Sequence, residues 1–491
     1  MPDTTATALA ESALSALGPT VRVPNYDRSQ LRRSIVHIGV GGFHRAHLAA
    51  YIDELCQAGH TGWSIVGVGV LETDATMAEV LAAQEHLYSL ISRGAASTDV
   101  SVVGAIVDYV LAVGDHRAVV ELVAAPDTQI VSLTITEGGY PIDDTTGAYL
   151  PESPVAGSAS AFGLIAAGLQ ERHAAGLGPI TILSCDNIMS NGDAARRATV
   201  GEATRISPEL AAWVEAEVTF PNSMVDRITP ATTDADRAFL AEAYGLADRW
   251  PVVAEPFRQW VIEDSFAADR PPFEQLDVIV TDDVEPYELM KLRLLNAGHS
   301  CLAYLAALLD IEHVHTAMDD ASIRSYVEAF LDHEAKPGLP PVAGVDLDAY
   351  TATLIERFAN PQIRDQIARL CLDGSAKFPK FLLPTVRAQL DTGGPVALSA
   401  LALAGWCQYL TGRSQNDKAI EPSPDPLLAD ARRYASASLD EPERFLDFDA
   451  VFERALAGDD RFRAAFVHAL TSLREDGVQH TLKRMVAEAG S

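Results

Sequence analysis

A lysine, an asparagine and a histidine lie close together in the apolar stretch over residues 287–299, YELMKLRLLNAGH. If this stretch is one α-helix, with about 100° of rotation per residue, then Lys291, Asn296 and His299 share an arc of roughly 140°. The remainder of the stretch is mostly leucine and alanine. A base, an amide donor and an imidazole facing one pocket are the groups needed to take a proton from an alcohol. The spacing therefore predicts a proton-transfer site on this helix.

A lysine that acts as a base must be partly neutral near the working pH. The pKa of a free lysine is about 10.4, so burial must lower it by two or three units, roughly 3–4 kcal/mol of differential solvation. Glu288, one turn before Lys291, either relays the proton to solvent or forms an ordinary ion pair with the lysine. Asn296 and Gly298 are unfavourable inside a helix, so they either serve the site or end the helix.

A second motif begins near residue 34, where SIVHIGVGG reads as a β-strand running into a glycine-rich turn. A dinucleotide site needs such a strand, a turn that lets backbone N–H groups reach the pyrophosphate, and the start of a helix. Gly39 and Gly41 stand at the first two positions of G-x-G-x-x-G, and Gly42 and Phe43 follow. His44 replaces the third glycine, and such a strand exit can also be a plain tight turn. Together with the lysine stretch, the motif indicates a nicotinamide-dependent alcohol dehydrogenase.

The next predicted strand, at 64–68, leads to two acids, Glu72 and Asp74. A carboxylate in this position accepts hydrogen bonds from the adenosine ribose. No arginine or lysine occurs between Gly67 and Gln84, and two carboxylates would repel a 2′-phosphate. This favours NAD over NADP, although both acids could also complement the dipole of the helix that follows.

Asn187 comes directly after another predicted strand, at 180–184, in the sequence SCDN. The carboxyl ends of parallel strands are where ligands bind in such folds, which makes Asn187 a candidate partner of the reacting oxygen. Capping of a helix that starts near Asp193 is an equally good explanation.

Two other dehydrogenase classes fit the sequence poorly. Tyr287 and Lys291 have the Y-x-x-x-K spacing of short-chain dehydrogenases, but they lie about 250 residues after the glycine turn, at the head of a helical region. A zinc enzyme is not supported, because the sequence has no H-E-x-x-H motif and no cysteine cluster.

The bulk composition narrows the function further. The net charge of −31 over 491 residues disfavours binding to nucleic acid or to anionic membranes. The five cysteines are far apart, which predicts reduced, buried thiols rather than disulfides. No apolar run approaches the ~18 residues of a membrane span, and we expect a cytoplasmic protein.

The pattern of apolar residues predicts two domains. Strands alternate with helices in the first part, which indicates a parallel sheet with helices on both faces. The predicted strands are 35–40, 64–68, 102–107, 129–136 and 180–184, with short strands from 218 to 281, and the predicted helices are 45–57, 75–83, 116–123 and 158–174. From 285 onward almost only helices are predicted: 288–310, 320–332, 347–358, 375–390, 395–410, 424–436 and 461–488. The expected fold is therefore α/β, with a Rossmann-type domain at 1–284 and a mainly α-helical domain at 285–491.

Several long motifs resemble the polyol-specific long-chain, metal-independent dehydrogenases. The similarity extends from Ile35 to about Lys483. The motifs are GVGGFHRAH at 39–47, SLTITEGGY at 132–140, SCDN at 184–187, FPNSMVDRITP at 220–230, the lysine helix, and DGSAKFPK at 373–380.

The resemblance implies a Rossmann-type domain, a helical domain and an active site in the cleft between them. It implies that Lys291 is the general acid/base, that Asn187 and Asn296 flank the reactive oxygen, and that His299 contacts substrate. It further places substrate contacts at Asp226, Arg369 and Lys377, the ribose acid at Asp74 with Glu72 beside it, and a proton path at Glu288, with Glu137 in a matching motif.

The resemblance also implies the reaction and the assembly. NAD-dependent oxidation of D-mannitol to D-fructose is expected, by a monomer. D-Arabinitol and hexuronate ketoacids such as D-fructuronate remain rival substrates, since Arg369 or Lys377 could bind a carboxylate. An NAD-binding sensor without catalysis would keep the glycine turn but would not need the complete set of lysine, asparagine and histidine.

Overall fold

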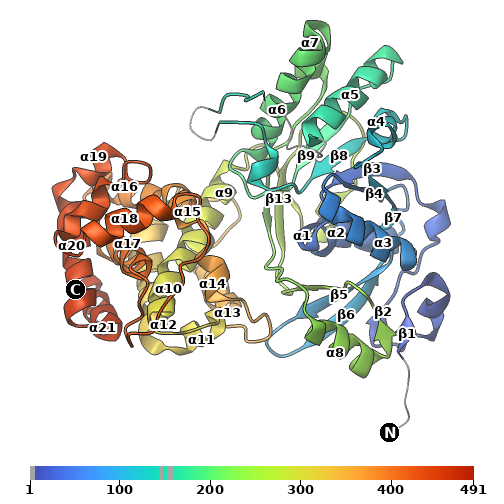
Figure 1. Ribbon diagram of the computed structural model, residues 1–491. Coiled ribbons are helices and arrows are strands. Elements are labelled where there is room, and N and C mark those ends of the chain that lie inside the picture. Colours follow the sequence, from blue (N-terminus) through green and yellow to red (C-terminus); the bar gives the residue numbers. More distant parts are fainter. Residues whose placement is uncertain (1–5, 144–146, 152–159, 491) are drawn as a thin grey trace. The chain divides into compact units, whose positions relative to one another are not determined.

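The chain forms two compact units, Met1–Glu285 and Pro286–Ser491. The structure is a computed structural model that describes residues 6–143, 147–151 and 160–490 (Figure 1). The sequence predicted a boundary one residue earlier, after 284. Residues 158 and 159 of one predicted helix lie outside the described residues.

A five-stranded parallel sheet organises the first unit (Figure 1). Its strands are β3 (Arg33–Ile38), β4 (Ser64–Gly69), β7 (Ile106–Leu111), β8 (Ile130–Leu133) and β9 (Thr181–Ser184). They stand in the order β7-β4-β3-β8-β9, and every neighbouring pair is parallel. Numbered along the chain, this is the order 3-2-1-4-5 of a Rossmann fold. The predicted α/β fold with a Rossmann-type sheet is confirmed.

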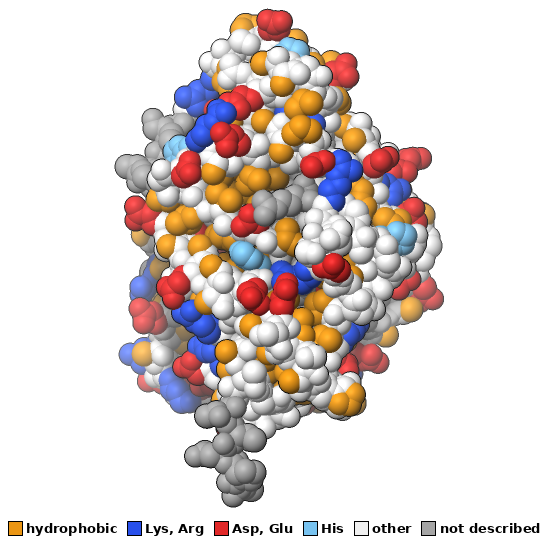
Figure 2. Space-filling model, turned by 90° about the vertical axis from the view of Figure 1, so that its right-hand side faces the viewer, with side chains coloured by type: hydrophobic (Ala, Val, Ile, Leu, Met, Phe, Trp, Pro, Cys, Tyr) orange, Lys and Arg blue, Asp and Glu red, His pale blue; other side chains and the backbone are white. Residues whose placement is uncertain are grey.

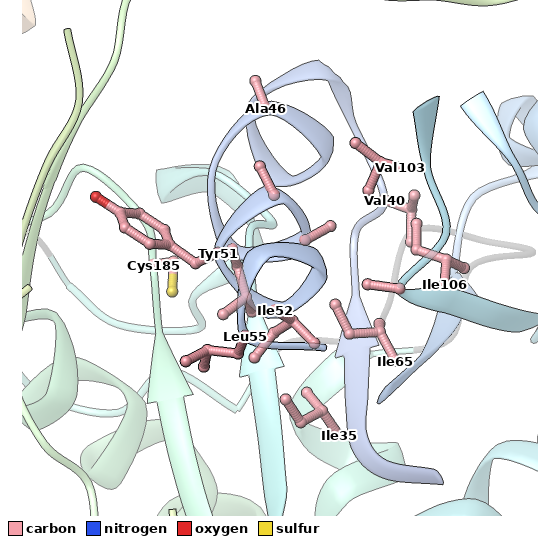
Figure 3. Close-up of a cluster of buried hydrophobic side chains, with 14 of the residues drawn as sticks. Ile35, Val40, Ala46, Tyr51, Ile52, Leu55, Ile65, Val103, Ile106 and Cys185 are labelled. Atoms are coloured by element: carbon pink, nitrogen blue, oxygen red, sulfur yellow. The ribbon is translucent and has the colours of Figure 1, made fainter. Parts of the chain in front are cut away.

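Helices cover both faces of this sheet, because its strands carry apolar side chains on both sides. Ile35 packs on one face with α2 (Leu48–Gln57) and α3 (Ala75–Ala83), and Figure 3 shows α2 lying over the strands. Val36 and Ile38 pack on the other face, against helices α4 (His116–Ala124), α5 (Ala161–Ala174), α6 (Asn191–Ile206) and α7 (Pro208–Glu217). The alternation of β3 thus places the sheet between two apolar layers.

Over the described residues, the first unit also has three smaller sheets. One has the order β12-β5-β6-β2, one β10-β13-β14, and one pairs β1 with β11. Their bounds are β1 (Thr7–Ala8), β2 (Val21–Arg22), β5 (Tyr88–Arg93), β6 (Thr98–Val103), β10 (Ser223–Asp226), β11 (Leu246–Ala247), β12 (Val252–Ala254), β13 (Gln259–Glu263) and β14 (Ile279–Thr281), with α8 at Asp234–Tyr244.

Two predicted elements of the first unit were wrong. The predicted strand at 102–107 spans the end of β6 and the start of β7, which belong to different sheets. The predicted helix at 45–57 is broken at His47 (φ −117°, ψ −94°) into α1 (Gly42–Ala46) and α2. The aromatic rings of Phe43, Tyr51 and Trp260 surround His47, so tertiary packing overrides the helical pattern there.

The second unit is helical throughout its named elements, as predicted. These are α9 (Glu285–Lys291), which begins one residue before the boundary, α10 (Ala297–Leu308), α11 (Val314–Asp319), α12 (Ala321–Phe330), α13 (Leu347–Phe358), α14 (Ile367–Leu370), α15 (Gly374–Phe381), α16 (Leu383–Thr392), α17 (Ala397–Leu410), α18 (Leu428–Ala437), α19 (Arg454–Ala457), α20 (Asp460–Glu475) and α21 (Val478–Ala489). The predicted helix at 461–488 was wrong, because Gly477 (φ +78°) separates α20 from α21. The predicted helix at 375–390 is likewise two helices, which meet at Leu382.

The cysteines are buried, and many acidic side chains lie on the surface, as the composition indicates. All five cysteines are free and buried, which confirms the predicted thiols. Acidic side chains are spread over the face shown in Figure 2, with basic side chains among them. Among the described residues, no helix has the length and apolar character that crossing a membrane requires.

Candidate active site

The glycine turn lies at the carboxyl end of β3, the central strand of the parallel sheet. Gly39 has φ +94°, and a Cβ atom there would stand 2.2 Å from the carbonyl oxygen of Thr134. Only glycine therefore fits at this position. A Cβ on Gly41 would meet only the carbonyl oxygen of Gly39, at 4.0 Å, so the missing side chain leaves open space beside the turn. Such space lets a cofactor approach the backbone closely, which fits a dinucleotide.

His44, which replaces the third glycine, packs inward. Its ring stacks on His37 of β3, with centroids 3.4 Å apart and planes 9° from parallel. Burial lowers the pKa of His37 to about 3 and that of His44 well below its ordinary value, so both rings are neutral. The close contact between helix and strand that the third glycine usually permits is made here by two neutral stacked rings. Gly42 and Phe43 form the first turn of α1.

The two candidate ribose acids lie at the end of β4, in the turn η3 (Glu72–Asp74). One carboxylate oxygen of Asp74 accepts hydrogen bonds from the backbone N–H groups of Val70 and Leu71, both at 2.9 Å. Glu72 is exposed. Asp74 therefore fixes the loop that leaves β4, and its role as the ribose acid stays a prediction.

A residue to which the sequence assigned no role, Asp186, holds the loop after β8. Its carboxylate accepts from the N–H groups of Ile135 (3.2 Å) and Thr136 (2.7 Å) and from the Tyr140 hydroxyl (2.8 Å). Thr136 has φ +61°, which is unfavourable outside glycine. The loop carries the exposed Glu137, so Asp186 positions that residue. Its place beside Asn187, in a strand exit, was the available signal.

Asn187 follows Asp186 at the end of β9, at the edge that also carries the glycine turn. The first N–H groups of α6, at Gly192 and Asp193, donate to the side chain of Asn222. The capping role considered for Asn187 is therefore filled by Asn222. Buried Asn191 ties this region to β10, because it donates to the carbonyl oxygens of Asp186 and Ser223.

Asp226 is the last residue of β10 and is buried. Its strand is joined to the end of β9 through Asn191 and through the Ser223 hydroxyl, which donates to the Ser184 carbonyl oxygen at 2.7 Å. These hydrogen bonds fix the position of Asp226 relative to the strand end that carries Asn187.

In the second unit, the lysine stretch is helical but not a single α-helix. A π-turn, η6 (Leu292–Asn296), joins α9 to α10. In an unbroken α-helix, Lys291 and His299 would point about 80° apart, and the extra residue of a π-turn rotates later residues back by about 100°. The two side chains therefore point within roughly 20° of each other. The prediction of one unbroken α-helix was wrong, and the π-turn brings the directions of Lys291 and His299 closer together than that helix would.

Three of the candidate polar groups on these helices are buried. Lys291 is 7% exposed, Glu288 is 5% exposed and His299 is 9% exposed. The His299 ring stacks on Phe358 of α13, with centroids 4.1 Å apart. Desolvation of this kind favours the neutral form of a lysine, as a base requires.

Two further candidate residues lie on α14 and α15. Arg369 forms a bidentate ion pair with Asp365, Nε to Oδ1 at 2.7 Å and Nη2 to Oδ2 at 2.5 Å. Lys377 donates to the carbonyl oxygen of Leu370 at 3.2 Å. Both α14 and α15 pack against α10, which carries His299. Asp365 was missed in the sequence, although its spacing of four residues from Arg369 was visible.

The fold and these sites define a Rossmann-type nucleotide-binding unit followed by a helical unit with a buried lysine. Two family models match the chain, the mannitol dehydrogenase Rossmann domain at residues 33–275 and the mannitol dehydrogenase C-terminal domain at 283–474. The chain therefore belongs to the mannitol dehydrogenase family.

Individual relatives match over almost their whole length. Mannitol 2-dehydrogenase of Aspergillus fumigatus is 41% identical over 487 residues, which cover 96% of this chain and 97% of the relative. The structure of Pseudomonas fluorescens mannitol 2-dehydrogenase, a ternary complex with NAD and D-mannitol, has a TM-score of 0.89 and 41% identity, over 98% of this chain and 100% of that one. A D-sorbitol dehydrogenase in substrate-free form also has a TM-score of 0.89, with 36% identity over 97% and 100% of the two chains.

Proposed function

We propose that the protein is an NAD-dependent, metal-independent mannitol 2-dehydrogenase, which oxidises D-mannitol at C2 to D-fructose and catalyses the reverse reduction. The observation that carries the proposal is the full-length similarity to an enzyme solved with NAD and D-mannitol. The glycine turn and the buried lysine supply the two parts that this chemistry needs, a dinucleotide site and a base.

The proposed mechanism assigns one role to each polar group. NAD supplies the hydride acceptor when it is bound at the glycine turn. Neutral Lys291 takes the proton of the C2 hydroxyl, and protonated Lys291 returns it when the ketose is reduced. Asn187 and Asn296 donate hydrogen bonds to the oxygen as it gains charge, an arrangement in which one donor is typically worth about 10²–10³ in rate. His299, Asp226, Arg369 and Lys377 orient the substrate, and Glu288 passes the proton towards solvent.

The preference for NAD over NADP rests on Glu72 and Asp74. Two carboxylates at the end of β4 would repel a 2′-phosphate, whereas one of them can accept from the ribose hydroxyls. Asp74 is held in place by two backbone N–H groups, so its position is fixed before a cofactor binds.

The test of this function is a comparison of initial rates. D-Mannitol, D-sorbitol and D-arabinitol are oxidised with NAD or NADP, and D-fructose, D-xylulose and D-fructuronate are reduced with NADH or NADPH. We expect the highest kcat/KM for D-mannitol and D-fructose, with NAD(H). D-Sorbitol is included because a D-sorbitol dehydrogenase is 36% identical. A chain that binds NADH but turns over none of these compounds would be a sensor and not a dehydrogenase.

The role of Lys291 has its own test. Lys291→Ala should lose about 10³-fold or more in kcat, because it removes the base, while NADH affinity measured by fluorescence stays nearly unchanged. Lys483→Ala is the matched control, since Lys483 is an exposed lysine on α21 of the same unit. If Lys291→Ala keeps more than about a tenth of the activity, the acid/base role belongs to another group.

We further propose that the enzyme works as a monomer in the cytoplasm, without nucleic-acid or membrane partners. Five buried free thiols suit a reducing compartment, and a net charge of −31 opposes binding to phosphate-rich surfaces. Size-exclusion chromatography with light scattering tests the assembly state, and a dimer would contradict the proposal.

A further inference from the structure

Asp365 and Arg369 form a bidentate ion pair at the start of α14. Arg369 is on the one-turn helix α14, and Asp365 lies two residues before that helix begins. Two parallel hydrogen bonds join the guanidinium to the carboxylate. The backbone N–H of Gln366 also donates to Oδ1 of Asp365, at 2.9 Å, and this hydrogen bond helps to hold the carboxylate in place.

Asp365 stays ionised although it is 7% exposed. Burial by itself would raise the pKa of Asp365, but the Arg369 guanidinium, His299 and the Gln366 N–H together bring it below its ordinary value. Burial likewise acts against the charge of Arg369, and Asp365 outweighs it by raising the pKa of that guanidinium. At neutral pH the pair therefore carries one full positive and one full negative charge, with no net charge.

Arg369 keeps hydrogen-bonding capacity on its outer edge. A guanidinium has more N–H donors than the two that Asp365 uses, and the Arg369 side chain is 52% exposed. The edge that faces away from Asp365 can therefore donate to an oxygen of a bound molecule. This edge of Arg369 presents N–H donors with a fixed direction, and Asp365 already neutralises the positive charge of the guanidinium.

We propose that Asp365 is a specificity-determining residue, which cancels the charge of Arg369 so that this part of the substrate site accepts a neutral hydroxyl and disfavours a carboxylate. The inference rests on the proposed function, since it takes Arg369 as a substrate contact of a polyol dehydrogenase. It concerns the contribution of Arg369 to the choice between neutral and anionic substrates, which the sequence left open. A carboxylate on the outer edge of Arg369 would be attracted by the guanidinium and repelled by the Asp365 carboxylate, so the pair would give it little net attraction.

The experiment compares D-fructose with D-fructuronate, the ketose that carries a carboxylate. The ratio of kcat/KM for D-fructuronate to that for D-fructose is measured with NADH for the wild type and for Asp365→Asn. The asparagine keeps the shape of the side chain and removes its charge. We expect the ratio to rise at least about tenfold, and the rise to shrink at high ionic strength. The inhibition constant of D-fructuronate against D-fructose reduction should fall in parallel, which gives a reading that does not need its turnover.

A matched control separates this effect from a general change in charge. Glu328 on α12 accepts from the Nε of Arg324, also four residues away, and both side chains are exposed. Glu328→Gln removes the same charge from the same kind of pair and should change the ratio by less than about twofold.

A second variant keeps the inference falsifiable if Asp365→Asn does not fold. Arg369→Gln leaves the Asp365 carboxylate without its cation, so the ratio should fall below that of the wild type. An unchanged ratio in Asp365→Asn, or a wild type that prefers D-fructuronate, would overturn the inference while leaving a dehydrogenase. Absence of turnover with every polyol and ketose would instead overturn the proposed function.

Discussion

Each unit buries a carboxylate that accepts hydrogen bonds from two backbone N–H groups and one hydroxyl. In the first unit Asp186 accepts from Ile135, Thr136 and the Tyr140 hydroxyl. In the second unit Glu334, which is fully buried, accepts from the N–H groups of Leu398 and Ser399 and from the Ser399 hydroxyl. The local chemistry is the same, and the surroundings differ.

The difference lies in what each carboxylate holds. Asp186 fixes a loop with a positive φ at Thr136, at the strand edge that also carries Asn187 and the glycine turn. Glu334 satisfies the first N–H groups of α17, a helix packed within the second unit. Burial raises the pKa of both acids, and the donors oppose that effect. We therefore expect the buried carboxylate of the first unit to affect ligand binding and that of the second unit to affect stability alone.

The largest expected effect concerns the loop that Asp186 holds, because Gly39 lies against the start of that loop at Thr134. In Gly39→Ala the new Cβ would stand 2.2 Å from the Thr134 carbonyl oxygen, at φ +94°. We expect a loss of about 4 kcal/mol in the free energy of unfolding, from the clash and the backbone strain together. Gly59→Ala is the control, since Gly59 has φ +97° and nothing within 4 Å, and should cost about 1 kcal/mol. If urea denaturation shows equal losses of unfolding free energy in Gly39→Ala and Gly59→Ala, the backbone around Gly39 has moved to relieve the clash.

Glu334 predicts a pH dependence of stability. Burial, partly opposed by the Ser399 and Leu398 donors, raises its pKa from 4.5 to about 7. An acid whose pKa is raised on folding releases its proton sooner in the unfolded chain, so this contribution is full below pH 4.5 and is lost as the pH rises to about 7. The shift corresponds to about 3 kcal/mol. In Glu334→Gln, unfolding measured at pH 5 and pH 7.5 should show a smaller decline than in the wild type.

An intermediate effect is expected for Asp186→Asn. Ile135 and Thr136 donate to different oxygens of Asp186, so the asparagine NH2 group would face one of these two N–H groups, at a cost of about 2 kcal/mol. Because the loop lies at the predicted ligand edge, kcat/KM should also fall by about tenfold at a temperature where the variant is folded. Glu334→Gln, measured in the same way, should keep kcat/KM within about twofold. If both variants lose activity equally, the two carboxylates do not differ in the way proposed.

The smallest expected effect comes from removing the hydroxyl donor in each unit. Tyr140→Phe and Ser399→Ala each take one hydrogen bond from a buried carboxylate, and each should cost about 1 kcal/mol in unfolding free energy. Only Tyr140→Phe should also change the KM for NADH, because Tyr140 closes the loop that begins at Thr134. If Ser399→Ala changes the KM for NADH by the same amount, the two carboxylates do not differ in their effect on cofactor binding.

The sequence predicted the fold class well, because it depends on local patterns. Runs such as 35–38 are apolar on both faces, which marks a buried parallel strand, and the spacing of apolar residues after 285 marks helices. Prediction from the sequence failed where tertiary packing decides the local backbone conformation. The break at His47 is stabilised by the rings of Tyr51 and Trp260, and Trp260 lies more than 200 residues away along the chain.

The sequence by itself determined which chemical groups the protein has: a glycine turn at a strand end, a lysine with Asn296 and His299, and acids without a nearby cation at 72 and 74. Only the tertiary structure decided how those groups are aimed and compensated. The π-turn at 292–296 sets the direction of Lys291 relative to His299, and the bidentate contact with Asp365 pairs the guanidinium of Arg369. Such features depend on where a helix changes its winding and on contacts made after folding, and residue types and spacing do not encode them separately.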